Sequence, residues 1–426
     1  MALLDLLADL EFRGQLYQQT DAEGLRQHLA TPRKIYCGFD PTKDSLTIGN
    51  LVQILILRRF QDAGHTPVVV MGGGTGMIGD PSGKETERQI LTPEQVELNV
   101  AGQRVCFERL LRFDGPNAAQ LVNNADWLGK LGFIEALRDI GKHFSINMMI
   151  QKDSVRERLN NRDQGISYTE FSYMLLQAYD FSYLMKHHGV TVQSSGSDQW
   201  GNIVAGIDLI RRTQQREAFG LTTPLVTKAD GGKFGKTESG AVWLTAERTS
   251  PYAFYQFWVN AADADVPKFL RTFTFFSHEE IVRLESEHRD NPGARTAHRA
   301  LAQHMTELLH GAEGLAQAQK ATEALFSGSV AELSQAAIVD LFGSAPSVTL
   351  SKAKLGGEGC PAADLLVDGG VVKSKREARE FLGNNAILIN GRTPGADTRI
   401  GADWLLHDEV LLIRRGKKLW HVVRFS

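Results

Sequence analysis

The chain has few cysteines and almost no net charge, and both features limit the classes of protein to which it can belong. Its 426 residues include three cysteines, Cys37, Cys106 and Cys360, which are an odd number and show no CxxC spacing. We therefore expect neither a disulfide framework nor a cysteine zinc site, and a reducing compartment fits this usage better. The formal net charge of −3 argues neither for nor against a nucleic-acid partner.

Membrane-directing segments are also absent from the sequence. No apolar stretch approaches the length that spans a bilayer. The first ten residues place two aspartates inside a leucine-rich run without a basic leader, which predicts an amphipathic helix rather than a signal peptide. The sequence therefore predicts a cytoplasmic protein with no membrane partner.

What the chain does contain is typical of a globular protein with more than one domain. Apolar residues make up 42% and charged residues 23% of a length that is too great for a single core. Residues 34–39 predict a buried strand, residues 48–63 a helix that Gly64 closes, and residues 67–71 and 120–123 two further strands. This alternation predicts an α/β fold with a parallel sheet and a ligand site at the carboxyl ends of its strands.

The second half of the chain follows different patterns. From about residue 250 to 325 the apolar spacing is helical, and residues 326–355 are rich in Ser, Gly and Ala. The last segment combines a basic helix at 374–382 with a strand that runs into the Asn390-Gly391 turn. We expect a helical domain, a linker and a small α+β domain.

The glycine-rich segment 74–79 satisfies the GxGxxG pattern after a predicted strand. A nicotinamide or flavin site would require a helix to begin there, but Asp80 and Pro81 follow at once, so this interpretation is disfavoured. Gly83-Lys84 lacks the upstream glycine and the following Ser or Thr of a P-loop. The segment is instead expected to form a glycine-lined floor for a planar or phosphorylated ligand.

Two further loops have both a phosphate-binding and a structural interpretation. Lys233-Phe-Gly-Lys-Thr237 places two lysines and a hydroxyl in a glycine-bounded loop that suits polyphosphate, although a solvated turn is equally well supported. Residues 40–50 lead into a helix N-terminus, whose free N–H groups suit phosphate. Simple N-capping by Ser45 or Thr47 is the better interpretation of that segment taken alone.

Five segments occur in an order that resembles one enzyme family. They are Tyr-Cys-Gly-Phe-Asp-Pro-Thr at 36–42, Gly-Met-Ile-Gly-Asp-Pro-Ser at 76–82, Thr-Glu-Phe-Ser-Tyr with Leu-Gln-Ala-Tyr-Asp within 169–180, Gly-Ser-Asp-Gln-Trp-Gly-Asn at 196–202, and the loop 233–237. Together they resemble the bacterial tyrosyl-tRNA synthetases, a family of class I aminoacyl-tRNA synthetases. The similarity extends over essentially the whole chain.

The resemblance implies an ATP-dependent ligase of protein biosynthesis. Such an enzyme condenses ATP and L-tyrosine to tyrosyl-adenylate and then passes tyrosine to the 3′ end of tRNA(Tyr). The resemblance also implies Mg²⁺ with ATP, no zinc, no organic cofactor, no protein metal site, and a homodimer formed through a connective insert. Its domains would be a Rossmann-like catalytic domain at 1–222 with the insert near 129–165, a helical domain with the KFGKT loop at 223–325, a linker at 326–355 and an S-four-like RNA-binding domain at 356–426.

Candidate site residues follow by position in the matching segments. The resemblance assigns tyrosine binding to Tyr36, Asp40, Asp80, Tyr173, Gln177, Asp180 and Gln199. It assigns ATP binding to Cys37, Gly38, Gly49, Gly196, Asp198, Lys233 and Lys236. It assigns catalysis, through stabilisation of the departing pyrophosphate, to Thr42, Thr47, Asn50, Lys84, Arg88, Lys233, Lys236 and Thr237.

Within the tyrosine set, Tyr36 and Asp180 would hydrogen-bond the substrate phenol, so a substrate without the hydroxyl would leave them unpaired. The spacing of Tyr173, Gln177 and Asp180 supports a site independently of the resemblance. They lie at i, i+4 and i+7, which puts three polar side chains on one face of an otherwise apolar helix.

The chain departs from the family at the helix start. The family signature there is His-x-Gly-His, whereas this chain has Thr47-Ile48-Gly49-Asn50. Gly49 still leaves room for adenine against the backbone, and Asn50 and Thr47 still offer hydrogen-bond donors. We therefore expect an active enzyme with weaker stabilisation of the pyrophosphate.

The tail is implied to contact tRNA through basic side chains. Solvated basic faces are the alternative, but beside a tRNA enzyme phosphate contact is the better interpretation. The residues are Lys373, Lys375, Arg376, Arg379, Arg414, Arg415, Lys417 and Lys418.

Two other functions remain open at this stage. A tryptophanyl-type synthetase is a sister enzyme, but the Tyr36 and Asp180 pair favours a phenol over an indole. A non-catalytic RNA-binding paralogue would explain the missing histidines, but it would have no need of a phenol pocket.

Overall fold

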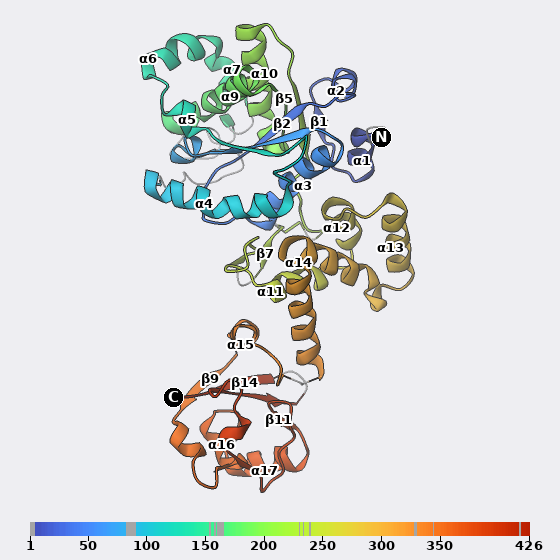
Figure 1. Ribbon diagram of the computed structural model, residues 1–426, viewed down its shortest axis with the longest axis vertical. Coiled ribbons are helices and arrows are strands. Elements are labelled where there is room, and N and C mark those ends of the chain that lie inside the picture. The colour runs from blue at the N-terminus through green and yellow to red at the C-terminus, as the bar shows by residue number, and fades with distance from the viewer. Residues whose placement is uncertain are drawn as a thin grey trace. The chain divides into compact units, whose positions relative to one another are not determined.

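The computed structural model describes residues 5–81, 91–152, 155–156, 159, 166–229, 231–232, 234–237, 240–327, 330–343, 345–416 and 419–426. The chain forms two compact units (Figure 1). The first comprises Met1–Thr249 and Trp258–Leu309, and the second comprises Ser250–Phe257 and His310–Ser426. Among the described residues, no helix combines the length and the hydrophobicity that a membrane span requires.

A six-stranded sheet forms the centre of the first unit, in the order β1-β6-β5-β2-β3-β4. All neighbouring strands are parallel except β1, which runs antiparallel to β6. The strands are β1 (Gln18–Gln19), β2 (Lys34–Phe39), β3 (Thr66–Met71), β4 (Gln120–Asn123), β5 (Val190–Gly196) and β6 (Phe219–Thr223). The α/β fold class predicted from the sequence is confirmed, and so are the strands predicted at 34–39, 67–71 and 120–123.

Helices cover both faces of this sheet. Figure 1 shows α3 and α4 on one side and α9 and α10 on the other. Buried residues of β2 and β3 pack against α9, where Phe181 and Leu184 are fully buried. The helices of this part are α1 (Leu6–Phe12), α2 (Ala22–His28), α3 (Ile48–Asp62), α4 (Pro93–Leu110), α9 (Tyr168–His188) and α10 (Trp200–Gln214).

The strand order places a topological switch between β2 and β5. From β2 the chain proceeds outward through β3 and β4, and it then returns to the other side of β2 to form β5 and β6. Adjacent connections that leave in opposite directions open a crevice beyond the carboxyl ends of the two strands. A ligand site is therefore expected where β2 and β5 end.

The segment predicted as a connective insert, near 129–165, consists of short helical turns in its described residues. Around it lie α5 (Ala125–Leu128), α6 (Phe133–Glu135), a π-helix (Ala136–Ile140), a 3₁₀ turn (Gly141–His143) and α7 (Ile146–Ile150). Its long apolar side chains are largely exposed, for example Phe133 at 67% and Ile134 at 72%.

The predicted helical stretch from 250 to 325 is confirmed. It contains α11 (Pro251–Val259), α12 (Val266–Phe273), α13 (His278–Asp290) and α14 (Thr296–Ser327). Gly311 interrupts α14 with non-helical backbone angles, close to the boundary between the two units.

The second unit contains a small α+β fold, as predicted for the tail. Its four-stranded sheet has the order β11-β13-β14-β9. Asn390 and Gly391 both have positive φ after β11, as an Asn-Gly turn requires. The elements are α15 (Gln335–Phe342), β9 (Ser347–Leu350), β10 (Cys360–Pro361), α16 (Ala362–Asp368), α17 (Lys375–Gly383), β11 (Ile387–Ile389), β12 (Arg399–Ile400), β13 (Val410–Arg415) and β14 (Leu419–Phe425). Thus α15 and β9 lie in the segment 326–355, and β9 pairs with β14.

Candidate active site

A buried carboxylate occupies the crevice side of α9. Asp180 is 3% exposed, and its two oxygens accept hydrogen bonds from Asn124 Nδ2 at 2.9 Å and Trp127 Nε1 at 2.7 Å. Burial raises the pKa of the Asp180 carboxyl to about 7, although both donors act in the opposite direction. The carboxylate is therefore held in one orientation while keeping lone pairs available for a further donor.

Tyr36 presents an unpaired hydroxyl near this carboxylate. Its side chain is 2% exposed, its ring packs against Phe181, and its hydroxyl oxygen has no hydrogen-bond partner among the described residues. Burial raises the pKa of the Tyr36 phenol, and the negative charge of Asp180 raises it further by a smaller amount. A buried hydroxyl without a partner costs free energy, so a ligand group that forms a hydrogen bond with it would remove this cost.

A second carboxylate, Asp40, follows β2 directly. It accepts from the Tyr173 hydroxyl at 3.0 Å and from Thr75 Oγ1 at 2.8 Å. Because Tyr173 belongs to α9 and Thr75 to the turn after β3, Asp40 joins three of the predicted segments. An Asn124 amide donates to Thr75 Oγ1 at 3.0 Å, which connects this group to Asp180.

Amide side chains form a network at the end of β5. Gln199 Nε2 donates to Asp80 at 2.6 Å and to Asp198 at 3.2 Å. Asn202 donates to both Gln199 Oε1, at 2.9 Å, and Gln177 Oε1, at 3.0 Å. The network brings together residues from the turn after β3, from α9 and from the β5–α10 connection, so four predicted tyrosine-site and ATP-site residues meet here.

The backbone at Gly38, next to the end of β2, has open space beside it. A Cβ atom added there would meet nothing within 4 Å, whereas one added at Gly196 would approach Asp198 Oδ1 to 2.6 Å. Cys37, between Tyr36 and Gly38, is buried, and burial raises the pKa of its thiol to about 12. The thiol therefore stays uncharged at neutral pH. A planar ligand can lie against Gly38 without a side chain in the way.

The glycines in and just before the GxGxxG segment allow this turn to pack closely against the loop after β2. Thr75–Met77 forms a short 3₁₀ turn, not the start of a long helix. A Cβ at Gly72 would lie 2.3 Å from Asp40 Oδ1, and one at Gly76 would lie 2.9 Å from Pro41 Cδ. These glycines let the turn approach the loop after β2, and this geometry does not support a dinucleotide site.

The KFGKT loop lies at the N-terminus of α3. Ile48 N–H donates to Val242 O and Leu244 N–H donates to Leu46 O, each at 2.9 Å, so the segment after the loop pairs with the segment before α3. Gly235 has φ +78°, and a Cβ there would lie 2.5 Å from Ile48 Cγ2. Phe234 is buried. The two predicted polyphosphate segments are therefore neighbours.

Thr47 and Asn50 interact with each other. Thr47 donates to Asn50 Oδ1 from its backbone N–H at 3.1 Å and from its hydroxyl at 2.9 Å. The Thr47 hydroxyl proton is thus used inside the helix cap, while the Asn50 residue is exposed. Asn50 is consequently the better placed of the two to donate to a ligand.

Some predicted residues cannot be placed in this way. Lys84, Arg88, Lys233, Lys417 and Lys418 lie outside the described residues, and only the backbone of Lys236 and Thr237, in β7 (Lys236–Thr237), is described. Thr42 is exposed in the loop after β2. That loop is held by α4, where Asn99 donates to Pro41 O at 2.8 Å.

Sequence reasoning missed four polar residues of the site, namely Thr75, Asn124, Trp127 and Asn202. Asn124 and Trp127 precede Asp180 by more than fifty positions, so no local spacing connects them. Their only sequence signal is their position just after β4, at the carboxyl edge of the sheet.

The basic residues of the tail differ in their surroundings. Lys373, Lys375, Arg376 and Arg379 are exposed, at or on α17. Arg414 and Arg415 are partly buried, and Arg415 donates to Val371 O at 3.0 Å. The α17 set is therefore the more accessible surface for phosphate.

Comparison with known proteins matches two ranges of the chain to protein families. Residues 29–327 match the family described as tRNA synthetases class I (W and Y). Residues 337–423 match the family described as the tyrosine–tRNA ligase SYY-like C-terminal domain. The first match covers more than half of the chain, so the chain is a class I tRNA synthetase.

Full-length relatives narrow the family further. Tyrosine–tRNA ligase of Staphylococcus carnosus is 51% identical over 425 residues, covering 99% of both chains. The enzyme of Bacillus caldotenax is 51% identical over 427 residues, covering 99% of this chain and all of the relative. A C-terminally truncated mitochondrial tyrosyl-tRNA synthetase from Aspergillus nidulans superimposes with a TM-score of 0.68 at 29% identity, covering 76% of this chain and 94% of that one.

The chain therefore belongs to the tyrosine–tRNA ligases, also called tyrosyl-tRNA synthetases. The tryptophanyl-type and non-catalytic alternatives receive no support from these relatives.

Proposed function

We propose that this protein activates L-tyrosine with ATP and transfers the tyrosyl group to the 3′ end of tRNA(Tyr). In the first step a carboxylate oxygen of tyrosine attacks the α-phosphorus of ATP. The bond from that phosphorus to the bridging oxygen breaks, and pyrophosphate leaves with the electron pair. In the second step a hydroxyl of the terminal adenosine attacks the tyrosyl carbonyl carbon, the bond from that carbon to the phosphate oxygen breaks, and AMP leaves while its phosphate takes up the hydroxyl proton.

The observation that carries this proposal is the unpaired Tyr36 hydroxyl beside the buried Asp180. A phenol that enters this pocket can donate to Asp180 and accept from Tyr36, which satisfies both groups at once. Phenylalanine would leave the Tyr36 hydroxyl unpaired and would give Asp180 no donor beyond Asn124 and Trp127. The pocket therefore selects tyrosine by its hydroxyl.

At the other end of tyrosine, Asp40, Asp80, Tyr173 and Gln177 offer acceptors for the ammonium group. Asp40 and Asp80 supply negative charge, and the Tyr173 and Gln199 bonds fix their orientation. Gln199 is assigned to the tyrosine carboxylate, since its amide lies where β5 ends. These roles are positional, because a carboxylate nucleophile needs no general base.

ATP is assigned to the backbone around Gly38, Gly49 and Gly196, of which Gly38 and Gly49 are exposed. Asp198 would accept from the ribose, and Cys37 would be an uncharged neighbour. The triphosphate would lie between the α3 N-terminus and the KFGKT loop, where Asn50, Thr42 and the loop lysines stabilise the departing charge. Mg²⁺ enters with ATP as part of the substrate. Lys84 and Arg88 are assigned to the same phosphates from the family resemblance alone.

The proposal also includes a homodimer that works in the cytoplasm. Exposed apolar side chains gather in the insert, where Phe133, Ile134, Ile146 and Met148 are each more than half exposed. Such a patch is typical of a surface that a partner covers. Sedimentation equilibrium tests it, and a monomer at micromolar concentration would contradict it.

Tyrosine-dependent ATP–pyrophosphate exchange tests the proposed activation step. We expect exchange with L-tyrosine and none above background with phenylalanine or tryptophan at equal concentration. Exchange that depends on tryptophan, or no exchange with any of the three, would overturn the assignment.

A further inference from the structure

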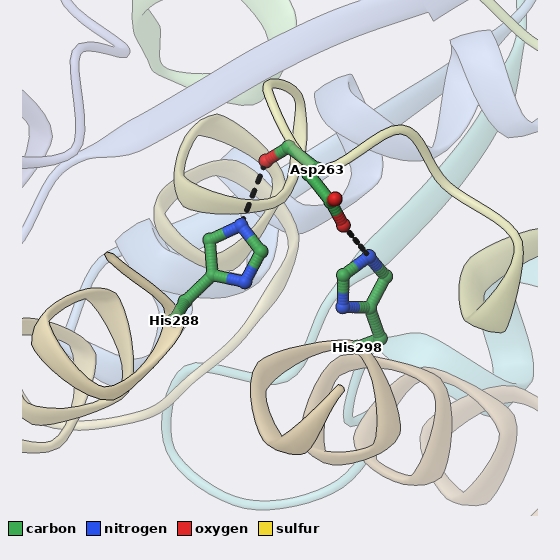
Figure 2. A group of neighbouring side chains, drawn as sticks. All are labelled: Asp263, His288 and His298. Atoms are coloured by element: carbon green, nitrogen blue, oxygen red, sulfur yellow. Dashed lines mark hydrogen bonds and ion pairs between the residues drawn. The ribbon is translucent and has the colours of Figure 1, made fainter. Parts of the chain in front are cut away.

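Three side chains that commonly bind metals meet outside the active site, at the junction of a loop and two helices (Figure 2). Asp263 lies in the loop between α11 and α12, His288 near the end of α13 and His298 in the first turn of α14. One candidate ligand atom from each lies within 4.8 Å of the others. His288 and His298 are 8% and 0% exposed, whereas the Asp263 side chain is 58% exposed.

The hydrogen bonds show that Nε2 of each ring carries a hydrogen. His288 Nε2 lies 2.9 Å from the backbone oxygen of Asp263, and His298 Nε2 lies 3.2 Å from the backbone oxygen of Ala261. A carbonyl oxygen can only accept, so each Nε2 carries a hydrogen, and in the neutral ring Nδ1 then carries the lone pair. His298 Nε2 also lies 3.1 Å from Asp263 Oδ1.

The two Nδ1 atoms are the unexplained feature. Both are buried, and neither has a hydrogen-bond partner among the described residues. Figure 2 shows the two rings turned toward each other below the Asp263 carboxylate. A buried polar atom without a partner costs free energy, and a cation that binds both lone pairs would remove that cost.

We propose that His288 Nδ1, His298 Nδ1 and the Asp263 carboxylate bind one divalent transition-metal ion, of which Zn²⁺ is the best match. Imidazole nitrogen with carboxylate oxygen is a common zinc ligand set, and the exposed side at Asp263 leaves a fourth position for water. The Nε2–H bonds to backbone oxygens are the outer contacts that orient metal-binding histidines.

Binding requires a modest local contraction. Zinc ligands at about 2.0–2.1 Å in a tetrahedron lie roughly 3.3 Å apart, whereas a ring nitrogen of each histidine and a carboxylate oxygen of Asp263 lie within 4.8 Å of one another. The Asp263 carboxylate can supply most of this movement by rotating, because it is largely exposed and His298 Nε2 keeps Ala261 O as its acceptor. The ion would then fasten the 260–265 loop to α13 and α14.

The site was not predicted from the sequence, where no protein metal site was expected. Asp263, His288 and His298 show none of the short ligand spacings that mark zinc motifs. The alternative is that both rings only hold the loop through their Nε2 bonds. That alternative leaves the Nδ1 atoms unpaired and predicts no specific metal affinity.

The experiment uses tag-free, full-length protein stripped with a chelator and desalted. Zn²⁺ is titrated by calorimetry, and Co²⁺ is added as a spectroscopic probe of coordination. We expect one Zn²⁺ per chain, a Co²⁺ d–d spectrum, and a rise in Tm with Zn²⁺. Asp263→Asn and His298→Gln should each weaken binding at least tenfold, while His187→Gln, a substitution of an exposed histidine on α9, should not.

Folding is checked separately. Asp263→Asn changes an exposed side chain and keeps the backbone acceptor, so its metal-free melting curve should match that of the unmodified protein even if His298→Gln is less stable. The proposal stands only if both variants lose affinity and His187→Gln does not. Any other pattern, including equal Zn²⁺ affinity in the unmodified protein and in Asp263→Asn, overturns it.

Discussion

Asn124 donates from Nδ2 to Asp180 Oδ2 at 2.9 Å, and this bond helps to fix the orientation of the buried carboxylate that we propose binds the tyrosine phenol. Because burial raises the pKa of Asp180 to about 7, the folded apo enzyme holds the proton up to that pH, whereas the unfolded carboxyl releases it near pH 4. Unfolding between these values therefore releases a proton, and stability falls as pH rises from about 4 to 7.

Asp180→Asn should remove this pH dependence. In urea unfolding at a series of pH values, the unmodified protein should lose more stability between pH 5 and pH 8 than the variant, by on the order of a few kcal/mol. Parallel curves for the two proteins would contradict a raised pKa at this position.

Tyr36→Phe tests the unpaired hydroxyl. Since that hydroxyl has no partner among the described residues, its removal should leave the free energy of unfolding unchanged or slightly raised. The KM for tyrosine in pyrophosphate exchange should rise by roughly 2- to 15-fold, the value of one neutral hydrogen bond, and discrimination against phenylalanine should fall. Tyr17→Phe, at an exposed position, is the control. A loss of stability without a change in KM would show that the hydroxyl is structural.

Gly235→Ala and Gly231→Ala form a matched pair in the KFGKT region. Both glycines have φ +78°, so both substitutions carry the same backbone strain, but only a Cβ at Gly235 meets a neighbour, Ile48 Cγ2 at 2.5 Å. Gly235→Ala should therefore lower the exchange rate by at least about tenfold, while Gly231→Ala should stay within about threefold. Equal losses would mean that strain, and not the contact with α3, controls the rate.

Thr47 and Asn50 should behave as a coupled pair. Thr47→Ala removes the hydroxyl bond to Asn50, and Asn50→Ala removes that bond together with the one from the Thr47 backbone N–H. Because the two variants share the loss of the hydroxyl bond, the double variant should lose less activity than the two singles together, with a coupling energy of about 0.5–3 kcal/mol. Asn50→Ala should cost more than Thr47→Ala, because the Thr47 hydroxyl is used within the cap. Additive losses in pyrophosphate exchange would show that the two act independently.

Arg376 and Arg379 on α17 test tRNA contact. Replacing both with Gln should weaken tRNA(Tyr) binding and therefore charging. Binding should also depend less on salt, because the slope of log binding constant against log salt concentration falls by about one for each lost phosphate contact. Pyrophosphate exchange should not change. The exposed pair Arg283 and Arg289 on α13, replaced in the same way, is the control. Unchanged charging by the α17 variant would remove this helix from the tRNA surface.

The sequence predicted those parts of the site that local pattern encodes. The strand at 34–39, the helix after it and the face shared by Tyr173, Gln177 and Asp180 all follow from periodicity, and the structure places Tyr173 and Asp180 at the crevice as buried side chains. The family resemblance supplied most of the roles, because spacing alone could not separate a phosphate loop from a solvated turn.

Long-range partners could not be predicted in the same way. Asn124 and Trp127 lie beside Asp180 because β4 pairs with β3, and Gly235 lies beside Ile48 because residues 242–244 pair with 46–48. The cluster of Asp263, His288 and His298 depends likewise on how α13 and α14 pack. Such contacts are set by tertiary packing, which a single sequence does not display.

The pairing of residues 46–48 with 242–244 also limits how the active site can change shape during turnover. The segment that follows the KFGKT loop is tied to the entrance of α3 by two backbone hydrogen bonds, one from Ile48 to Val242 and one from Leu244 to Leu46. Residues 242–244 therefore cannot shift without moving the start of α3, so a substitution that displaces either segment should alter both.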